Sequence, residues 1–457
     1  MPMPPRRNWS GAPWLLLNQG DVQTERKQAL DEGRDLSSLE GEFTLVAQLD
    51  LAEEANQQRA EALFEAVQEA PIVAGYPYVE PSDLPGIQAA RPAPVALPQV
   101  KTSEAALLDK ALGAWQGRAS GCLLGKPVEG RRAWQIEKYL KAQDRWPLSR
   151  YFSLNIPEEI AKECGFNTSW TALYEEGITC MVEDDDTNYT ATGLAICKQY
   201  GAGFTPDEVA KFWLGNIPIF HVCTAERSAY RNLVDCLAPP ESASFHNPYR
   251  EWIGAQIRAD FFGYVNPGNP ERAADFAWRD ASISHIKNGI YGEMWVAAML
   301  AAAYVTSDIE TVIRAGMAQV PAHCRLSERL ERTLGLFASG LSYEEAVADL
   351  RTRWNEDSGH DWCHTISNAE IVAIALLWGA KDFEKTICYS VMPGFDTDCN
   401  GATAGSVLGL MLGASALPEK WIAPMNDTLL SGVAGYHEVH FSDMARKTLE
   451  LIHRDRE

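Results

Sequence analysis

Helical periodicity runs through the 457-residue chain from about residue 101 to its end, and no other pattern in the sequence limits the possible folds as strongly. Apolar residues recur at helical spacing in segments such as "TSEAALLDKALGAWQGRASGCLLG", which begins at Thr102. "TPDEVAKFW" and "SYEEAVADLRTRW" each carry a capping box, in which Thr205 or Ser342 precedes a glutamate by three residues. Alternating apolar and polar runs are scarce, and no internal repeat is found. The pattern predicts an all-α fold.

Two Ala-rich segments, "GEMWVAAMLAAAYV" (292–305) and "NAEIVAIALLWGAKDF" (368–383), are apolar nearly all round. A helix of this kind has no polar face for solvent, so we expect both to be central. Hydrophobic residues make up 46% of the chain, which is ample for a large core. The net charge of -22 argues against nucleic acid or an anionic membrane surface as a partner, and it is compatible with cation binding.

The ten cysteines are scattered, and none forms a C-x-x-C pair. In a long chain this usage is typical of reduced, mostly buried thiols in a cytosolic protein. The N-terminus has a basic pair, Arg6 and Arg7, but its apolar run of about four residues is too short for a signal peptide. The segment "VLGLMLGASAL" falls short of the roughly 18 apolar residues that a membrane span needs. We expect a cytoplasmic protein without a membrane segment.

Residues 1–100 differ in character from the rest of the chain. They hold two acidic segments with helical patterns, "ERKQALDEGRDLSSLEGEF" and "DLAEEANQQRAEALFEAVQEA". The Pro-rich stretch 75–99 follows, and it predicts an extended linker or a strap over the next domain. We therefore expect an N-terminal extension, 1–100, and one large helical domain, 101–457.

A first candidate for chemistry is "EDDDTNYT", in which Asp184, Asp185 and Asp186 come shortly after the apolar pair Met181 and Val182. Three consecutive residues cannot share one face of a helix, so the motif should lie in a loop or at a helix N-terminus. Thr187 or Asp186 is the predicted cap of the helix "NYTATGLAICKQY". Capping and a solvated turn would explain this motif if it stood alone.

A second acidic motif opens "GFDTDCNGATAGSVLGLMLG" (394–413). Asp396, Asp398 and Asn400 match the first half of a calcium-binding EF-hand loop, but the twelfth position is Val407, where a glutamate is required. Glycines then recur at 405, 409 and 413, which allows another backbone to approach one face of the helix. A second aspartate cluster at the start of a second buried helix makes capping alone a weaker explanation for both.

Glycines also recur every four residues, at 117, 121 and 125, in "GRASGCLLGKPVEG", and here too they allow close helix contact. Glu129 follows Pro127, where a helix would end, and can project from a loop.

Isolated polar residues interrupt two apolar stretches, "SISHIKNG" with His285 and Asn288, and "GHDWCHTISNAE" with His360, Cys363, His364 and Asn368. Zinc normally needs four well-spaced ligands, and no second group of ligands accompanies His360, Cys363 and His364 in the sequence. We expect these polar residues to be buried side chains with hydrogen-bond partners, or residues that contact a ligand, and not metal ligands.

Together these motifs resemble the ADP-ribosylglycohydrolase family, which includes the enzyme that reactivates ADP-ribosylated dinitrogenase reductase. Members carry G-x-x-x-G-D-x-x-G-x-x-x-E, then [S/T]-D-D-T, then a histidine after Ser or Thr, and finally G-x-D-T-D-[T/S]. The corresponding stretches here are "GRASGCLLGKPVE", "DDDT", "SH" and "GFDTDC", in the same order over roughly 300 residues. Residues 1–100 lie outside the resemblance.

The resemblance implies a large orthogonal helical bundle in which the aspartate clusters bind two Mg²⁺ or Mn²⁺ ions. It implies catalytic roles for Glu129 and Asp186, and it places a ribosyl substrate near His285. The expected metal and substrate residues are as follows: for metal, Asp184, Asp185, Asp186, Asp396, Asp398 and Cys399; for substrate, His285, Asn288, His364 and Asn368.

Three positions depart from the family pattern. Asp184 stands where Ser or Thr is usual, and Cys122 replaces the aspartate of the first motif. Cys399 stands where a metal-binding Thr or Ser is usual, and a thiol is a poor partner for a hard ion. These departures indicate a divergent subfamily and leave its substrate open.

The chemistry that the resemblance implies is physically coherent. Two divalent cations offset most of the charge of five aspartates, and oxygen ligands suit Mg²⁺ or Mn²⁺. Such a pair can clamp ribose hydroxyls and activate water, while a carboxylate stabilises the oxocarbenium-like state at ribose C1″.

We therefore expect a glycohydrolase that cleaves the N- or O-glycosidic bond of an ADP-ribosyl or related ribosyl conjugate. The alternatives are a metal-dependent hydrolase of small ribosides or nucleosides, and a non-catalytic binding or structural relative. A phosphohydrolase would leave Glu129 and the motif order unexplained. A homo-oligomer is left open.

Overall fold

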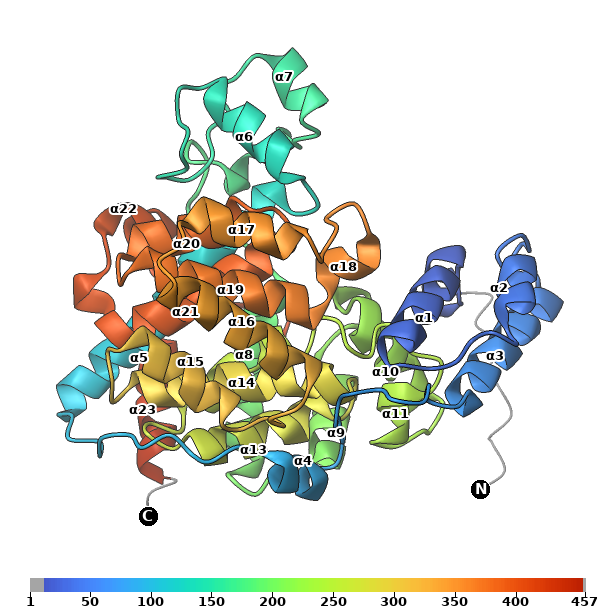
Figure 1. Ribbon diagram of the computed structural model, residues 1–457. Coiled ribbons are helices and arrows are strands. Elements are labelled where there is room, and N and C mark those ends of the chain that lie inside the picture. The colour runs from blue at the N-terminus through green and yellow to red at the C-terminus, as the bar shows by residue number, and fades with distance from the viewer. Residues whose placement is uncertain (1–11, 455–457) are drawn as a thin grey trace.

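The computed structural model of this chain describes residues 12–454, which are mostly helical (Figure 1). Arg6 and Arg7, the basic pair at the N-terminus, lie outside the described residues. The α-helices are α1 (Gln19–Asp31), α2 (Glu40–Val46), α3 (Glu54–Glu69), α4 (Leu84–Ala90), α5 (Glu104–Gly125), α6 (Ala133–Lys141), α7 (Glu158–Glu163), α8 (Asp185–Tyr200), α9 (Pro206–Asn216), α10 (Thr224–Val234), α11 (Glu241–Ser244), α12 (Asp260–Tyr264), α13 (Pro270–Ala281), α14 (Lys287–Ala303), α15 (Ile309–Met317), α16 (Arg325–Ala338), α17 (Tyr343–Arg351), α18 (Gly359–Cys363), α19 (Thr365–Gly379), α20 (Phe383–Val391), α21 (Thr397–Leu412), α22 (Glu419–Ile422) and α23 (Phe441–Arg454).

Short 3-10 turns and one small sheet complete the secondary structure. The turns are Pro13–Leu15, Lys126–Val128, Thr171–Leu173, Ile219–His221, Gln256–Arg258, Ala414–Ala416 and Ala423–Met425. Among the described residues the only strands are β1 (Thr428–Leu430) and β2 (Glu438–His440), which pair antiparallel. The predicted all-α class is confirmed. No helix in this part of the chain has both the length and the apolar character needed to cross a bilayer.

The two segments that are apolar all round form the centre of the bundle. α14 is buried at every position from Asn288 to Ala303, and α19 is buried at every position except Trp378. Both capping boxes are also present, at Thr205 before α9 and at Ser342 before α17. The local predictions for these helices are therefore confirmed.

The closest helix contact in the bundle joins α5 to α21, which run antiparallel. A Cβ placed on Gly121 would lie 1.8 Å from the carbonyl oxygen of Gly401, and one on Gly405 would lie 2.2 Å from that of Gly117. At the end of α5, the Thr397 hydroxyl donates a hydrogen bond of 2.8 Å to the carbonyl oxygen of Gly125. The two sets of spaced glycines are thus partners of each other. Their contact brings the C-terminus of α5 against the N-terminus of α21.

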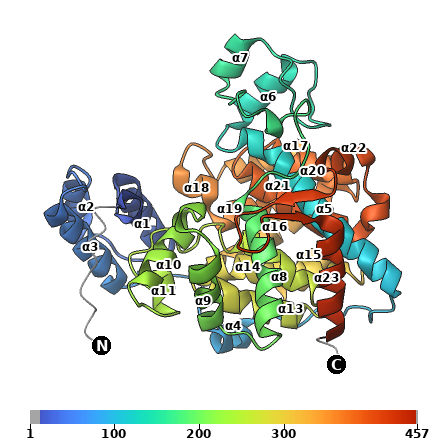
Figure 2. The same ribbon diagram turned by 180° about the vertical axis from the view of Figure 1, so that it is seen from behind.

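Helices α1, α2 and α3 lie beside the bundle, next to α10, α11 and α18, as both views show (Figures 1 and 2). They have an apolar core of their own, which includes Val22, Phe43, Leu63 and Phe64. The three helices agree with the helical patterns predicted for this acidic part of the chain.

The Pro-rich stretch 75–99 crosses the surface of the bundle as a strap. The indole N–H of Trp278 donates a hydrogen bond of 2.9 Å to the carbonyl oxygen of Ser82. The strap includes a short helix, α4, which its proline content did not predict, and Ile87 of α4 is fully buried in the main core. Whether residue 100 is a domain boundary stays a prediction.

A further segment, which carries α6 and α7, projects from the bundle at the top of Figure 1. It leaves the bundle directly after α5, through the 3-10 turn Lys126–Val128 and Glu129. Glu129 therefore lies at the base of this projection.

Candidate active site

Three helix ends meet at one buried position: the C-terminus of α5 and the N-termini of α8 and α21. The ammonium group of Lys126, just past the end of α5, lies close to carboxylates at the start of both α8 and α21. It contacts Oδ2 of Asp184 and lies 3.7 Å from Oδ2 of Asp398. It also lies 3.4 Å from Oε2 of Glu129. The two aspartate clusters, far apart in the sequence, thus surround a single amine.

Asp184 is the residue that caps α8. Its Oδ1 accepts a hydrogen bond of 2.9 Å from the backbone N–H of Asp186. The prediction that Thr187 or Asp186 caps the helix was wrong, because the chain already enters helical geometry at Asp185. The Thr187 hydroxyl instead donates to the carbonyl oxygen of Asp184, at 3.2 Å. The additional aspartate of this chain therefore has a defined structural role.

Asp186 is held by Arg118, a buried residue of α5. Nη2 of Arg118 lies 3.1 Å from Oδ1 of Asp186, and Nη1 lies 2.8 Å from Oδ2 of Asp260. The other oxygen of Asp186, Oδ2, is buried and has no hydrogen-bond partner among the described residues. Sequence reasoning missed Arg118 and Asp260. The signal for Arg118 is an arginine inside the small-residue segment "GRASG" of a helix expected to be buried.

The second cluster lies at the start of α21. The backbone N–H of Asp396 donates to Oδ1 of Asn368 at 3.3 Å, and the Cys363 thiol donates to Oδ2 of Asp396 at 3.6 Å. The same Asn368 oxygen accepts a hydrogen bond of 2.8 Å from Nδ2 of Asn400. Oδ1 of Asp398 is buried without a hydrogen-bond partner in the described structure. Asn368 and Cys363 thus position Asp396.

The pKa values show how crowded these carboxylates are. Burial raises the pKa of Asp185, Asp186 and Asp398 well above the ordinary value. Burial and the charge of Glu129 raise the pKa of Asp396 to about 6. Burial also acts to raise the pKa of Asp184, but the Lys126 ammonium outweighs it and lowers this pKa. Lys126 and Arg118 alone do not balance the charge of the cluster.

The residues present fit a divalent cation. Ligand atoms of Cys122, Asp184 and Asp186 lie within 4.8 Å of one another, and so do those of Asp396, Asp398 and Cys399. The unpartnered oxygens of Asp186 and Asp398 are hard ligands of the kind that Mg²⁺ and Mn²⁺ prefer.

The two cysteines fit such an ion less well than the carboxylates. Burial raises the pKa of Cys122 and of Cys399 well above the ordinary value, which keeps both as neutral thiols. The oxygens are therefore the main candidate ligands.

Glu129 lies at the open side of the cluster. It follows the 3-10 turn after α5, as expected for a loop residue, and its side chain is 44% exposed. Its charge contributes to the raised pKa of both Asp396 and Asp398, so it lies close to the buried carboxylates. The geometry gives it access both to the cluster and to solvent.

Contacts connect three of the four expected substrate residues, Asn368, His364 and Asn288, and the fourth, His285, lines a cavity. Asn368 adjoins the cluster through Asp396, and His364 adjoins Asn368 through a hydrogen bond of 3.0 Å from Nδ2 of Asn368 to the His364 carbonyl oxygen. Asn288 donates to Oε1 of Glu80 at 2.8 Å and to Oε2 of Glu251 at 3.4 Å, and this second oxygen also lies 3.8 Å from Nε2 of His364. Asn288 accepts a hydrogen bond from the backbone N–H of Leu326 at 3.0 Å. The side chain of Asn288 therefore serves to anchor the strap.

His285 is the fourth expected substrate residue. It is fully buried and lines a cavity of about 560 Å³ between the strap and the bundle, together with Ser82, Trp278 and Ile286. Within residues 12–454, no hydrogen bond or ion pair joins His285 to the carboxylate cluster. A substrate role for His285 and for Asn288 stays a prediction.

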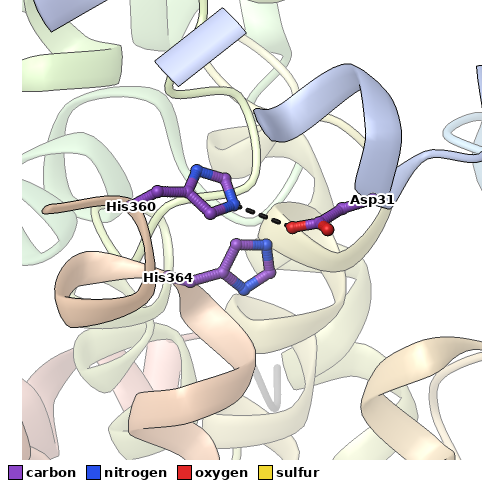
Figure 3. Close-up of side chains that lie close together, drawn as sticks. All are labelled: Asp31, His360 and His364. Carbon is purple, nitrogen blue, oxygen red and sulfur yellow. Dashed lines mark hydrogen bonds and ion pairs between the residues drawn. The ribbon is translucent and has the colours of Figure 1, made fainter. Parts of the chain in front are cut away.

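A separate group of possible metal ligands, Asp31, His360 and His364, lies between α1 and the bundle (Figure 3). The indole N–H of Trp252 donates to Nδ1 of His360 at 3.1 Å, and the backbone N–H of Ile366 donates to Nδ1 of His364 at 3.1 Å. Each neutral ring therefore carries its proton on Nε2, which leaves no lone pair there for a metal. Nε2 of His360 instead donates to Asp31, at 2.9 Å. This group ties α1 to the bundle.

Comparison with known proteins identifies the family of this chain. The model of the ADP-ribosylglycohydrolase family matches residues 103–455. A solved structure described as an "ADP-ribosylglycohydrolase-related protein complex" is 18% identical, with a TM-score of 0.48, and the match covers 77% of this chain and 99% of that one. No curated protein matches the chain. Because the family model covers most of the chain, this protein belongs to the ADP-ribosylglycohydrolase family.

Proposed function

We propose that this protein is a divalent-metal-dependent glycohydrolase that cleaves the bond at ribose C1″ of an ADP-ribosyl or related ribosyl conjugate. One observation carries the proposal. In a chain of this family, both aspartate clusters and Glu129 converge on a single position, where carboxylate oxygens are buried without partners. Buried carboxylate oxygens without a partner, in a cluster whose carboxylates outnumber its two cations, point to a bound cation.

The proposed ligands are Asp184, Asp185 and Asp186 on one side, and Asp396 and Asp398 on the other. When bound, a pair of Mg²⁺ or Mn²⁺ ions would orient ribose hydroxyls and lower the pKa of water. The chain supplies the rigidity: the cap at Asp184 and the Arg118 pair hold the first cluster, and Asn368 holds Asp396 in the second. Cys399 adjoins the second cluster, and its role as a ligand is part of the proposal.

Glu129 is the proposed acid–base residue. Its carboxylate is partly exposed, so it can reach a bound substrate, and it faces the cluster across Lys126. There it can stabilise positive charge developing at C1″ and exchange a proton with the attacking or leaving oxygen. Asp186 would act from the buried side, where Arg118 fixes one of its oxygens.

A second candidate function is hydrolysis of small ribosides or nucleosides. The two cations of the cluster, Lys126 and Arg118, are both paired with carboxylates, so neither is free to bind a diphosphate. The net charge of -22 also disfavours a polyanionic substrate. These two observations are the reason to keep small ribosides and nucleosides as the second candidate.

A panel assay for ribose release tests both candidates. It compares ADP-ribosyl-arginine protein, ADP-ribosyl-serine peptide, O-acetyl-ADP-ribose and simple nucleosides, each with Mg²⁺, Mn²⁺ or EDTA. We expect hydrolysis of at least one substrate, lost in EDTA and restored by metal.

Asp185→Asn and Asp396→Asn should each lower kcat by roughly 100-fold or more, because each removes a charged ligand. A matched control is Asp349→Asn, since Asp349 pairs with Arg332 and Arg353 away from the cluster. Activity that persists in EDTA, or in both site variants, would contradict the metal mechanism.

A further inference from the structure

Lys126 is the one positive side chain that lies between the two aspartate clusters in the described residues, and the mechanism above gives it no role. Its side chain is 15% exposed. Its ammonium group contacts Asp184, and it lies 3.4 Å from Glu129 and 3.7 Å from Asp398. A lysine held by carboxylates from three segments occupies the place that a cation would take.

The oxygens that Lys126 uses are oxygens that a metal ion would need. Oδ1 of Asp184 already accepts the hydrogen bond that caps α8, so Oδ2 is the oxygen more open to a ligand, and it contacts Lys126. On the opposite side Lys126 faces Oδ2 of Asp398. An ammonium group and a divalent ion on the same oxygens repel each other at short range.

Other carboxylate oxygens of the cluster have no partner among the described residues. Oδ2 of Asp186 and Oδ1 of Asp398 are buried, and neither has a hydrogen-bond partner among the described residues. No Arg, Lys or His pairs with Asp185 or Asp396 in this part of the chain. An ion can therefore bind to these groups without displacing any protein cation.

We propose that Lys126 is an internal competitor for one of the two divalent ions. The first ion binds while Lys126 stays at Asp184, and the second binds only after the ammonium group has left. The two ions therefore differ in affinity, and the second sets the metal concentration at which the full centre forms. This inference rests on the proposed function, because it presupposes a centre for two ions.

The experiment is a titration of the full-length, EDTA-treated protein with Mn²⁺, followed by calorimetry and by counting bound metal after equilibrium dialysis. Wild type should bind one ion tightly and a second weakly. Lys126→Met, which keeps an apolar stem and removes the charge, should tighten the second site by roughly 5- to 150-fold, the usual range of a coupling between sites. Lys126→Arg keeps the charge and should behave as wild type.

Lys110→Met is the matched control. Lys110 is also on α5, and its ammonium group donates to backbone carbonyl oxygens of α21 at 2.8 and 3.3 Å, away from the aspartates. It should leave both Mn²⁺ affinities unchanged. A second measurement is the gain in Tm on adding Mn²⁺, which should be larger for Lys126→Met than for wild type, because the variant has lost its internal cation.

The outcomes separate the two proposals. Two ions of equal affinity in wild type, with no change in Lys126→Met, would overturn the competitor role and leave the proposed function intact. No Mn²⁺ bound at millimolar concentration by wild type or by any variant would overturn the metal dependence of the proposed function and the competitor role with it. If Lys126→Met does not fold, the titration of Lys126→Gln decides between the same outcomes.

Discussion

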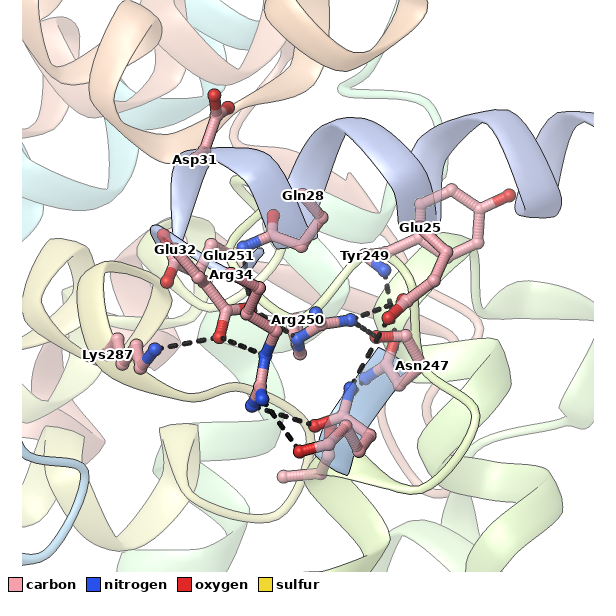
Figure 4. Close-up of polar contacts among 12 residues, drawn as sticks. Glu25, Gln28, Asp31, Glu32, Arg34, Asn247, Tyr249, Arg250, Glu251 and Lys287 are labelled. Carbon is pink, nitrogen blue, oxygen red and sulfur yellow. Dashed lines mark hydrogen bonds and ion pairs between the residues drawn. The ribbon is translucent and has the colours of Figure 1, made fainter. Parts of the chain in front are cut away.

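Two regions of this molecule bury groups of charged side chains, and they do so in opposite ways. The first is the interface between α1 and the bundle (Figure 4). Arg250 pairs there with Glu25 and, at 2.7 Å, with Glu32, and Lys287 also pairs with Glu32 at 2.7 Å. Each of these carboxylates has a cation of the protein as its partner.

The second region is the carboxylate cluster at the ends of α5, α8 and α21. There Asp185 and Asp396 pair with no Arg, Lys or His within the described residues, and Lys126 and Arg118 are the only cations. A charged network that is balanced by its own residues holds segments together. Carboxylates that are not balanced in this way must take up protons or bind a cation from outside. The balance of buried charge therefore separates a structural anchor from a candidate binding site.

Arg250→Met tests whether the paired charges at the α1 interface hold it to the bundle, because this variant leaves Glu25 and Glu32 buried without their main partner. We expect it to lower the free energy of unfolding by about 3–5 kcal/mol, the cost of removing one side of a buried pair. Chemical denaturation measures the loss. Arg314→Met is the control, because Arg314 forms its ion pairs at an exposed position and should cost at most about 1 kcal/mol. Equal losses of unfolding free energy in the two variants would contradict the idea that the Arg250 ion pairs anchor α1 to the bundle.

Gly121→Ala tests how the carboxylate cluster is assembled. The new Cβ would lie 1.8 Å from the carbonyl oxygen of Gly401, so α5 and α21 must move apart. We expect a loss of about 3 kcal/mol from overpacking, together with weaker Mn²⁺ binding. Gly203→Ala is the control, since no atom lies within 4 Å of its added Cβ. Unchanged Mn²⁺ binding in Gly121→Ala would show that the metal site does not depend on the close contact between α5 and α21.

Asp398→Asn asks whether the cluster is strained without metal. Burial raises the pKa of Asp398, which means that folding disfavours its charged form. Removing the charge should therefore raise the Tm in EDTA, by about 2–4 °C, and reduce the gain in Tm from Mn²⁺. At the anchor, Glu32→Gln should have the opposite effect, because the positive groups around Glu32 stabilise its charge. A fall in Tm for both variants would remove the distinction between the two regions.

Cys399→Thr has the smallest expected effect. A hydroxyl is a better ligand than a thiol for a hard ion, so Mn²⁺ affinity should rise by up to about tenfold if Cys399 contacts the ion. Mn²⁺ titration of the variant measures the change. Cys388→Thr, at a buried thiol outside the cluster, is the control. Identical affinities for wild type and Cys399→Thr would place Cys399 outside the coordination shell.

Local signals predicted much of the fold. The capping boxes at Thr205 and Ser342 and the central position of α14 and α19 depend on short-range hydrogen bonding and on burial of apolar faces, which neighbouring residues reveal. The cap of α8 was misplaced by two residues or more, because an aspartate in extended backbone at 184 competes with Asp186 and Thr187 for the same role.

Patterns in the sequence were enough to predict the helical class and to identify the two aspartate clusters and the glycines that allow close backbone contact. Three features could be seen only in the folded chain: α5 contacts α21, Lys126 lies against Asp184, and His285 lines a cavity between the strap and the bundle. Each of these contacts joins segments that are far apart in the chain. Spacing along a helix shows which residues share a face, but the face that each one meets depends on how all the helices pack.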